Sequence, residues 1–281
     1  MGILHLVATP IGNLEDISAR GLRTLREVRL IAAEDTRHTR QLLTHFDIHT
    51  PLTSYYEHNK LSKLDAILAA LAEGDVALVS DAGTPAINDP GYELVKAALA
   101  AGHTVSPVPG ASAPIAALAA SGLPTEAFLY LGYLPRKGGE RRALLGSVAE
   151  LPYTLIVLET PHRLMEALDD LLSLPGGTPA GAGRQMAAAR ELTKLHEQIV
   201  RGSVGEVKAH FTANEPRGEF TLVVEGKKMS DGGRWPDEQL QAAIRAGLKA
   251  GKPGKELAAE LAKVSGWPRR EVYSLIIAKK Q

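Results

Sequence analysis

The chain has 281 residues, of which 44% are hydrophobic and none is cysteine. This length favours two domains over one, and the lack of cysteine excludes disulfides and thiolate metal sites. The sequence contains no apolar run of about 18 residues and no charged leader before an apolar segment, which predicts a soluble cytoplasmic protein.

The formal net charge is zero, but the charges are unevenly distributed. Residues 227–281 hold 12 Lys and Arg against six Asp and Glu, so this tail carries a charge of +6 and the rest of the chain −6. A basic appendage favours a polyanionic partner. A solvated helical surface is the alternative, and it explains a bias of this size equally well.

The first half alternates short β-rich runs with segments of helical periodicity. Such alternation predicts an α/β domain with a mostly parallel sheet covered by helices. The apolar run at 76–80 is typical of a strand buried on both faces. Strands are predicted at 3–9, 29–34, 51–56, 76–80 and 103–108, and helices at 18–28, 61–73, 92–101 and 111–121.

The second half predicts a mixed sheet, because two strands near residues 190 and 200 follow each other closely enough to form an antiparallel hairpin. A joint is predicted at 121–128 (SGLPTEAF), so the domains are predicted at 1–122 and 123–228. GGTPAGAG at 176–183 is predicted as a loop. Strands are predicted at 128–134, 154–160, 185–193, 197–203 and 219–225, and helices at 139–150, 163–174 and 204–213.

The basic tail is predicted as a small helical domain at 234–281, joined through a linker at 227–236. Its run GKELAAELAKVSGWPRREVYSLII has the outline of a helix-turn-helix, although any helical hairpin has the same outline. The tail helices are predicted at 237–250, 253–264 and 268–279.

Three loops of the first half follow strands and are rich in Gly or Pro: ATPIGN (8–13), SDAGTPAINDPG (80–91) and PVPGASAP (107–114). One such loop is an ordinary turn, but three at one edge of a parallel sheet favour a ligand pocket, because ligands bind outside the carboxyl ends of strands. None matches a nucleotide phosphate loop or a dinucleotide fingerprint. Within the second loop, Asp89 is predicted to cap the next helix, with Pro90 at its first position.

Eight motifs in a fixed order carry a resemblance that covers residues 3–226. They are TPIGNLEDIS, AEDTRHTR, SDAGTPAINDPG, PVPGASAPIAALAASGLP, LYLGYLPRK, ETPHR, ARELTKLHEQ and GEFTLVVEG. Together they resemble the tetrapyrrole-methylase family, in its branch that methylates the ribose 2′-oxygen of small-subunit ribosomal RNA. The resemblance implies a two-domain tetrapyrrole-methylase-like fold, S-adenosyl-L-methionine as the cofactor and a cytidine of 16S ribosomal RNA as the target. It also implies a homodimer, and a 16S ribosomal RNA substrate that is part of the 30S subunit.

The resemblance implies that the cofactor lies folded between the two domains. When the family's cofactor residues are transferred to the matching motifs of this chain, they imply cofactor contacts from loops of the first domain and from strand ends of the second. One departure is Pro10-Ile11-Gly12, which stands where tetrapyrrole enzymes carry more glycine. The implied cofactor residues are Pro10, Gly12, Asp81, Gly83, Thr84, Ile87, Ser112, Ala113, Glu159 and Ala189 or Arg190.

Methyl transfer to a hydroxyl gains from a base that removes the hydroxyl proton. Asp35 is the preferred candidate because EDTR follows a strand end, and an ion pair of Asp35 with Arg37 or Arg40 is the equally weighted alternative. The other candidates are His38, Glu159 and Lys137. A structural ion pair between Arg163 and Glu191 is a further expectation.

RNA binding needs Lys and Arg on the surface, because phosphate contacts come from cations. The basic groups that could supply them are Arg37 and Arg40; Arg136, Lys137, Arg141 and Arg142; and, in the tail, Lys249, Lys252, Lys255, Arg269 and Arg270. Tyr55, Tyr56 and Tyr133 could stack on a base, although tyrosines of this kind are more often half-buried in a core.

No metal site is predicted, because the nine histidines form no His-Glu-x-x-His pair and have no cysteine partners. Two rival functions stay open at this point. One is a methyltransferase for a small tetrapyrrole carbon, and the other is a non-enzymatic nucleic-acid binder that works through its helical tail.

Overall fold

A computed structural model of the chain describes residues 2–56, 60–175, 183–227 and 235–278, the side chains of 60–62 excepted. The chain forms two compact units, Met1–Gly226 and Lys227–Gln281. Residues 176–182 of the predicted loop and 228–234 of the predicted linker lie outside the described residues. The division of the first unit near residue 122 stays a prediction, although each half contains its own sheet.

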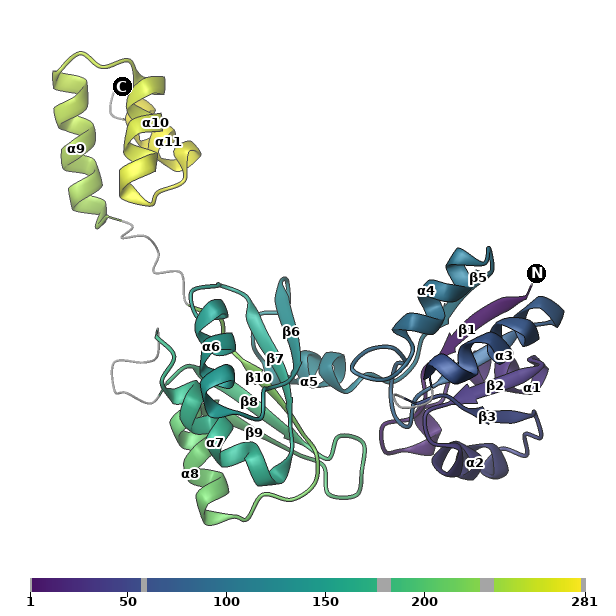
Figure 1. Cartoon of the computed structure of the whole chain (residues 1–281). Coiled ribbons are helices and arrows are strands. Elements are labelled where there is room, and N and C mark those ends of the chain that lie inside the picture. Colours follow the sequence, from purple (N-terminus) through teal and green to yellow (C-terminus); the bar gives the residue numbers. More distant parts are fainter. Residues whose placement is uncertain (1, 57–59, 176–182, 228–234, 279–281) are drawn as a thin grey trace. The chain divides into compact units, whose positions relative to one another are not determined.

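The sheet of the first half is parallel throughout, as predicted, and its strand order is β3-β2-β4-β1-β5 (Figure 1). The buried run that the sequence singles out is its central strand β4, in which all four residues are buried. The strands are shorter than predicted by one to three residues. They are β1 (Ile3–Val7), β2 (Leu30–Ala33), β3 (Leu52–Ser54), β4 (Val76–Val79) and β5 (Thr104–Val108).

Helices cover both faces of this sheet, because successive strand residues point to opposite sides. Ile31 and Val79 face one core with helices α1 (Ala19–Glu27) and α2 (Thr36–His45). Leu78 faces the other core, with α3 (Lys60–Glu73) and α4 (Tyr92–Ala100). The polar string AEDTRHTR does not predict α2, which forms because Leu42 and Leu43 bury one face of it.

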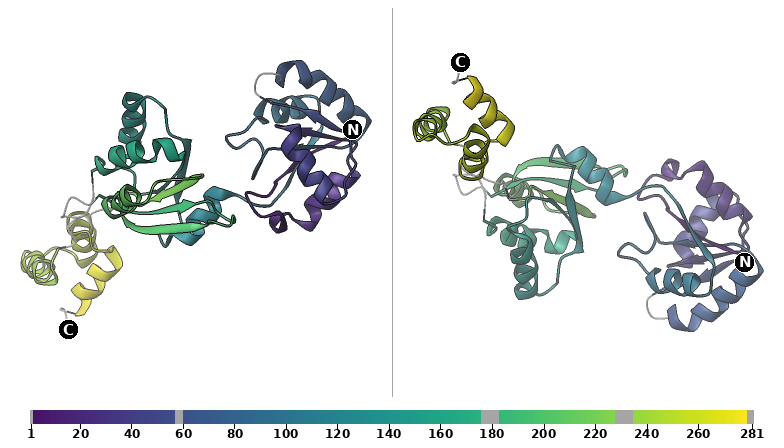
Figure 2. Two further views of the ribbon diagram at one scale, coloured as in Figure 1. Left: turned by 90° about the horizontal axis from the view of Figure 1, so that it is seen from below. Right: turned by 90° about the horizontal axis from the view of Figure 1, so that it is seen from above.

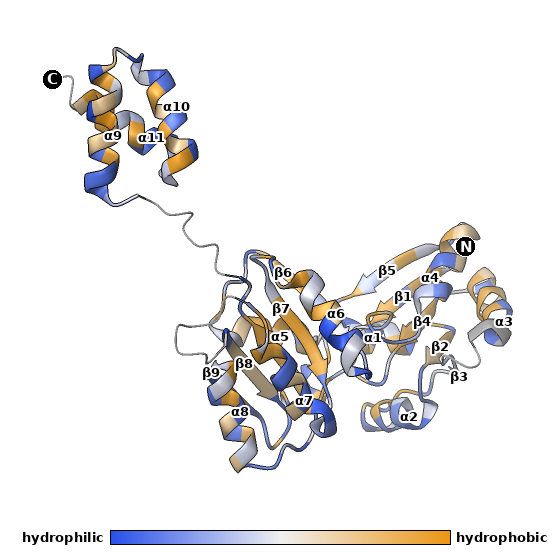
Figure 3. Ribbon diagram, turned by 60° about the vertical axis from the view of Figure 1, so that its left-hand side comes forward, coloured by the Kyte–Doolittle hydropathy of each residue, from blue (hydrophilic) through white to orange (hydrophobic). Residues whose placement is uncertain are grey.

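The second sheet is mixed, as predicted, with the order β6-β7-β10-β8-β9. Its β8–β9 hairpin is antiparallel and its β6–β7 pair is parallel. Hydrophobic residues dominate β7, which is orange in Figure 3. The strands are β6 (Phe128–Tyr133), β7 (Thr154–Glu159), β8 (Gln185–Arg190), β9 (Gln198–Ser203) and β10 (Phe220–Val224), and helices α6 (Gly138–Val148), α7 (Pro161–Leu172) and α8 (Val204–Ala213) pack on one face.

Helix α5 (Ala113–Ser121) covers the other face of the second sheet, although it follows the last strand of the first. Its Ala117 and Leu118 pack with Ile156, Ala187 and Val223 of three strands. The loop between β5 and α5 is therefore held between the two halves of the first unit.

The predicted cap of α4 is wrong. The helix begins at Tyr92 and its N-cap is Gly91, with φ 153°, so Asp89 and Pro90 lie before it. A Cβ on Gly91 would approach Ala86 Cβ and Leu78 Cδ2 to 2.9 Å. The loop folds back over the end of β4, and the chain turns into the helix only after this close approach.

The tail forms three helices, as predicted: α9 (Asp237–Lys249), α10 (Gly254–Ser265) and α11 (Arg269–Ala278). They gather around an apolar core of their own in each view (Figures 1 and 2). Gly266 ends α10 in the left-handed conformation, and Trp267 Nε1 donates to the Trp235 carbonyl at 2.8 Å. Among the described residues, no helix combines the length and the apolar character that a membrane crossing requires.

Candidate functional site

A cavity of about 450 Å³ opens at the carboxyl ends of the first sheet and reaches the second sheet. Its volume lies within the usual range of small-molecule sites, about 300–1,000 Å³. The walls come from both halves of the first unit. They are formed by Ile11, Glu34, Asp81 to Thr84, Ile87 to Asp89, Ser112 to Ile115, Phe128, Tyr130, Tyr133, Leu158, Ala189, Leu192, Lys194 and Glu219 to Thr221.

The first two loops are joined at the strand ends. The Thr9 amide donates to the Gly83 carbonyl at 2.9 Å, and the Gly83 amide donates back to Thr9 at 3.0 Å. Gly83 has φ 78°, a conformation that glycine adopts without strain. Thr84 Oγ1 also contacts the Ala111 carbonyl at 3.5 Å, so the second and third loops meet as well. The three predicted loops therefore form one continuous edge.

The tip of the second loop is strained. Ala86 and Asn88 have φ values of 67° and 65°, which residues other than glycine rarely adopt. The Asn88 side chain lies against Gly132, where a Cβ would come within 2.2 Å of Asn88 Nδ2. Gly132 stands at an irregularity of β6, between residues that pair with β7. Strain of this kind persists only where packing enforces it, and it concentrates at functional sites.

Acidic side chains gather at one end of the cavity. The Asp81 amide donates to Glu34 Oε2 at 3.3 Å, and burial raises the pKa of the half-buried Glu34 carboxyl. Burial, together with the charge of Glu34, raises the pKa of Asp89 to about 6. Asp89 is also hydrogen-bonded to Ser80. This end of the cavity favours a cationic ligand group.

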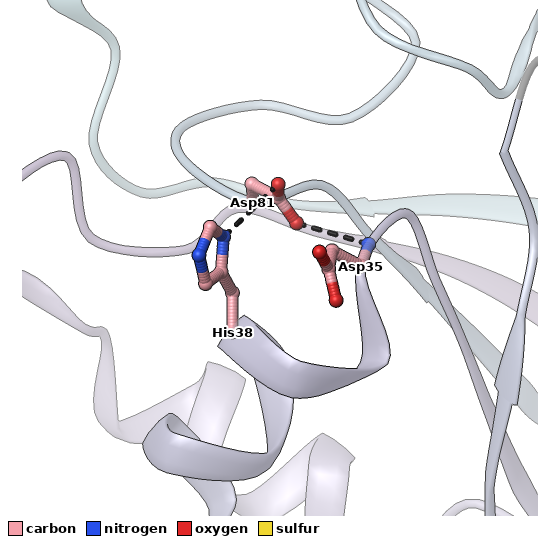
Figure 4. Close-up of side chains that lie close together, drawn as sticks. All are labelled: Asp35, His38 and Asp81. Carbon is pink, nitrogen blue, oxygen red and sulfur yellow. Dashed lines mark hydrogen bonds and ion pairs between the residues drawn. The ribbon is translucent and has the colours of Figure 1, made fainter.

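Asp35 stands at the start of α2, close to Asp81 and His38 (Figure 4), and its carboxylate is engaged by its own helix. It caps α2 by accepting from the Arg37 amide at 2.8 Å, and its Oδ2 lies 2.6 Å from Arg37 Nη2. These contacts lower the pKa of Asp35, which makes the carboxylate a weak proton acceptor. The ion pair with Arg37, the alternative left open by the sequence, is the arrangement present, and the role of Asp35 as the base stays a prediction.

Asp81 ties the second loop to α2. Its Oδ1 accepts from the Asp35 amide at 3.0 Å, and its Oδ2 lies 3.2 Å from His38 Nδ1. Donor atoms of Asp35, His38 and Asp81 lie within 4.8 Å of one another, a spacing that a metal ion could use. Both carboxylates already accept hydrogen bonds from protein groups, so the cluster is explained as a tie between loop and helix.

Most of the residues that the resemblance implies for the cofactor lie on the cavity wall. These are Asp81, Gly83, Thr84, Ile87, Ser112, Ala113 and Ala189. The structure places Pro10, Gly12, Glu159 and Arg190 off this wall. A Cβ on Gly12 would come within 2.4 Å of Lys194 Cγ, and Arg190 Nε donates to the Arg217 carbonyl at 2.6 Å.

The expected pair of Arg163 with Glu191 is wrong. Arg163 Nη2, in the first turn of α7, lies 2.9 Å from Oε1 of Glu159, which ends β7 four residues earlier in the chain. Glu191 instead binds Lys194 Nζ at 2.9 Å. Glu159 is buried in this pair and is not part of the cavity wall.

Several wall residues are absent from the sequence prediction. Glu34 and Asp89 could have been found, because each stands within or beside a loop already singled out. The apolar and aromatic residues of the second sheet carry no comparable local signal, since their strands are far apart in sequence. The unpredicted residues are Ile11, Glu34, Ala82, Asn88, Asp89, Pro114, Ile115, Phe128, Tyr130, Leu158, Leu192, Lys194, Glu219, Phe220 and Thr221.

The prediction that Arg141 binds RNA is wrong. Only 3% of it is exposed, and its Nε donates to Asp170 Oδ2 at 2.5 Å. A buried guanidinium in an ion pair cannot contact a phosphate. The others are exposed, and Arg37 and Arg40 border a shallow surface hollow on α2. The exposed residues are Arg37, Arg40, Arg136, Lys137, Arg142, Lys249, Lys252, Lys255, Arg269 and Arg270.

The predicted stacking tyrosines differ in their surroundings. Tyr55 is fully buried in the core of the first half, so it cannot stack on a base. Tyr56 is 40% exposed, and Tyr133 is 48% exposed and lies on the cavity wall. Only Tyr133 therefore combines exposure with a place at the site.

Residues 3–208 match the family of tetrapyrrole (corrin/porphyrin) methylases. Over nearly its full length the chain is also similar to proteins named ribosomal RNA small subunit methyltransferase I. It is 47% identical to that of Synechocystis sp., over 98% of this chain and 97% of the relative. It is 45% identical to that of Escherichia coli O157:H7, over 99% and 96%.

Solved structures share the fold at low sequence identity. Diphthine synthase matches with a TM-score of 0.60 and 16% identity, over 80% of this chain and 90% of that one. Uroporphyrin-III C-methyltransferase from Thermus thermophilus, complexed with S-adenyl homocysteine, matches with a TM-score of 0.53 and 21% identity, over 79% and 97%. The predicted two-domain tetrapyrrole-methylase-like α/β fold is confirmed.

Proposed function

Because this chain belongs to the tetrapyrrole methylase family, and within it to the group named ribosomal RNA small subunit methyltransferase I, we propose that it transfers a methyl group from S-adenosyl-L-methionine to ribosomal RNA of the small subunit. The observation that carries the proposal is the cavity in which three strand-end loops of the first sheet meet the second sheet. This is where an open parallel sheet binds its ligand.

The cavity residues suit this cofactor in chemistry. S-adenosylmethionine has a sulfonium and an ammonium group, and the cavity wall holds four carboxylates against one lysine: Glu34, Asp81, Asp89 and Glu219 against Lys194. Lys194 is itself paired with Glu191 and Glu219, each at 2.9 Å. Apolar wall residues such as Ile87, Ile115 and Leu192 offer a surface for an adenine ring. A related structure is described as complexed with S-adenyl homocysteine, which agrees with this fit.

When bound, the cofactor supplies an activated methyl group, so the work of the protein is positioning. Thr84 and Ser112 can donate to or accept from the ribose diol, and the mutual hydrogen bonds of Thr9 and Gly83 hold the first two loops in place. Holding two reactants in line is worth about 7–11 kcal/mol of the barrier. The strained second loop and the close packing at Gly132 restrict movement on this side of the cavity.

The finer proposal is that the target is the ribose 2′-oxygen of cytidine 1402 in 16S ribosomal RNA. Its support is the resemblance of the eight motifs, together with exposed basic groups on α2, at the start of α6 and in the tail. Tyr133, at the cavity wall, is 48% exposed and could stack on a splayed base. The proposal includes the assembled 30S subunit as the substrate.

A homodimer is the proposed working form. Support comes from α4, where Tyr92 and Leu99 are 67% and 56% exposed. These two residues are seven positions apart and therefore lie on one face of the helix.

The proposed activity is tested by transfer of a labelled methyl group to 30S subunits from cells that lack this modification. We expect label in 16S RNA, and nuclease mapping should place it on a 2′-O-methylcytidine. Subunits from modified cells are the control and should take up none. Label that enters only a small tetrapyrrole would replace the proposal with the C-methyltransferase alternative.

Replacing Asp81 by alanine is expected to weaken cofactor binding by about 10- to 100-fold, the equivalent of one charge-assisted hydrogen bond. The change removes a negative charge from the cavity. It also removes the contacts of the Asp81 carboxylate with the Asp35 amide and with His38 Nδ1. Calorimetric titration measures the affinity. Asp47→Ala, which removes an acid 91% exposed on the same half, is the control and should bind as wild type does. Wild-type affinity of Asp81→Ala would remove Asp81 from the binding site.

A further inference from the structure

We propose that Asp89 is the group that accepts the proton of the substrate hydroxyl during methyl transfer. The inference rests on the proposed function and deepens it, because it names the base of that site. The sequence predicts Asp89 only as a helix cap, and its place on the cavity wall follows from the way the second loop folds back over β4.

The position of Asp89 is fixed by the loop around it. Asn88, its neighbour, is held in the left-handed region against Gly132 of β6, and Gly91 packs on Ala86 and Leu78. The Asp89 side chain is half-buried on the cavity wall and hydrogen-bonded to Ser80. A base must be held within reach of the proton that it removes, and packing on both sides of Asp89 supplies this restraint.

The groups around Asp89 make it a stronger base than an ordinary aspartate. It faces the carboxylates of Glu34 and Asp81 from the ends of β2 and β4, and the phenols of Tyr130 and Tyr133 from β6. Burial and the negative charge of Glu34 raise the pKa of Asp89 to about 6. At neutral pH the group is therefore mostly ionised, and it accepts a proton more readily than a carboxylate of ordinary pKa.

Tyr130 of β6 lies on the same cavity wall, close enough to Asp89 to respond to its charge. Burial and the nearby Asp89 charge raise the pKa of Tyr130 to about 12, so its phenol stays protonated and can donate a hydrogen bond. The lysine of the cavity, Lys194, is paired with two glutamates and does not neutralise this end.

The other candidates are engaged elsewhere. None of the four lies on the cavity wall, and each is paired with another side chain of the protein. The pairs are Asp35 with Arg37, His38 with Asp81, Lys137 with Glu140 and Glu159 with Arg163.

In the proposed step, the O–H bond of the ribose 2′-hydroxyl breaks and its proton moves to a carboxylate oxygen of Asp89. The substrate oxygen forms the new bond to the methyl carbon. The bond between that carbon and the sulfonium sulfur breaks, and its electron pair stays on sulfur. Asp89 later returns the proton to solvent, so charge and atoms balance without another reactant.

Asp89→Asn tests the proposal, because the amide keeps the shape of the side chain but cannot accept the proton in the same way. We expect the turnover rate on 30S subunits to fall by about 10²- to 10⁴-fold. The wild-type rate should rise with pH through about 6 and then level off, since Asp89 must lose its proton to act. This rise should be absent in Asp89→Asn, while the cofactor dissociation constant from calorimetry increases by no more than about tenfold, because three wall carboxylates remain.

A readout without turnover uses protein labelled with ¹³C at the aspartate carboxyl groups. One aspartate should titrate near pH 6 in the free wild-type protein, and that signal should be missing from Asp89→Asn. Glu34→Gln is the matched comparison from the same cavity. Removing the Glu34 charge should move both this titration and the rise in rate to lower pH, because that charge holds the Asp89 pKa up.

Three results would overturn the assignment. In the first, Asp89→Asn has the rate and the pH profile of wild type. In the second, no aspartate of the wild-type protein titrates near pH 6. In the third, Asp89→Asn loses cofactor affinity but keeps the rise in rate near pH 6. The last would make Asp89 a cofactor ligand. If wild type itself transfers no methyl group to RNA, the proposed function fails together with the base; if wild type is active, only the role of Asp89 is at stake.

Discussion

Replacing Asp170 by alanine is expected to lower the free energy of unfolding by about 3–5 kcal/mol, because it leaves the buried charge of Arg141 without its main partner. Asp170 accepts from Arg141 Nε at 2.5 Å and from Arg142 Nη1 at 3.4 Å. Arg141 is only 3% exposed and Asp170 8%. The remaining partner of Arg141, Glu166, is 67% exposed in its side chain and compensates only in part.

The measurement is a urea unfolding curve of the full chain, followed by circular dichroism. Asp169→Ala is the matched control from the adjacent position. Asp169 pairs with Lys208, and this pair contacts solvent, because the Asp169 side chain is 57% exposed and the Lys208 side chain 32%. A surface pair of this kind contributes about 0–1 kcal/mol. Equal losses from the two variants would mean that the buried pair contributes no more than an exposed one.

Removing residues 228–281 is expected to weaken binding to ribosomal RNA about tenfold or more at physiological salt, and to make the salt dependence shallower. The tail is a compact unit with its own core and holds exposed cations such as Lys255, Arg269 and Arg270. Each phosphate contact that is lost should reduce the slope of log K against log salt by about one unit. Cofactor affinity should not change, because every residue of the cavity wall lies within Met1–Gly226.

Filter binding at several salt concentrations gives the slope, and calorimetry gives the cofactor affinity. The triple variant Lys255→Gln, Arg269→Gln and Arg270→Gln keeps the tail but removes three of its charges, and it should reproduce part of the effect. RNA binding unchanged by truncation would assign the tail another role. Sequence-selective duplex binding by the tail in the absence of methyl transfer would favour the non-enzymatic alternative.

The sequence by itself determined the elements and the edge at which the site would form. Hydrophobic periodicity and the positions of Gly and Pro are local signals that can be read from a few neighbouring residues. They therefore predicted the parallel sheet, the mixed second sheet and the three helices of the tail. The loops at 8–13, 80–91 and 107–114 were located for the same reason. The order of eight motifs indicated the family, since a shared order over 220 residues or so is not produced by local propensity.

Only the tertiary structure decided which side chains meet. Asp35 looked like a base from its place after a strand, but α2 turns it toward Arg37. Arg141 looked like a surface cation, but α7 brings Asp170 against it. Asp89 looked like a cap, yet the loop folds it into the cavity wall, where burial and the charge of Glu34 raise its pKa. Burial and the charges of distant residues set these properties, and neither is encoded in the spacing of neighbours along the chain.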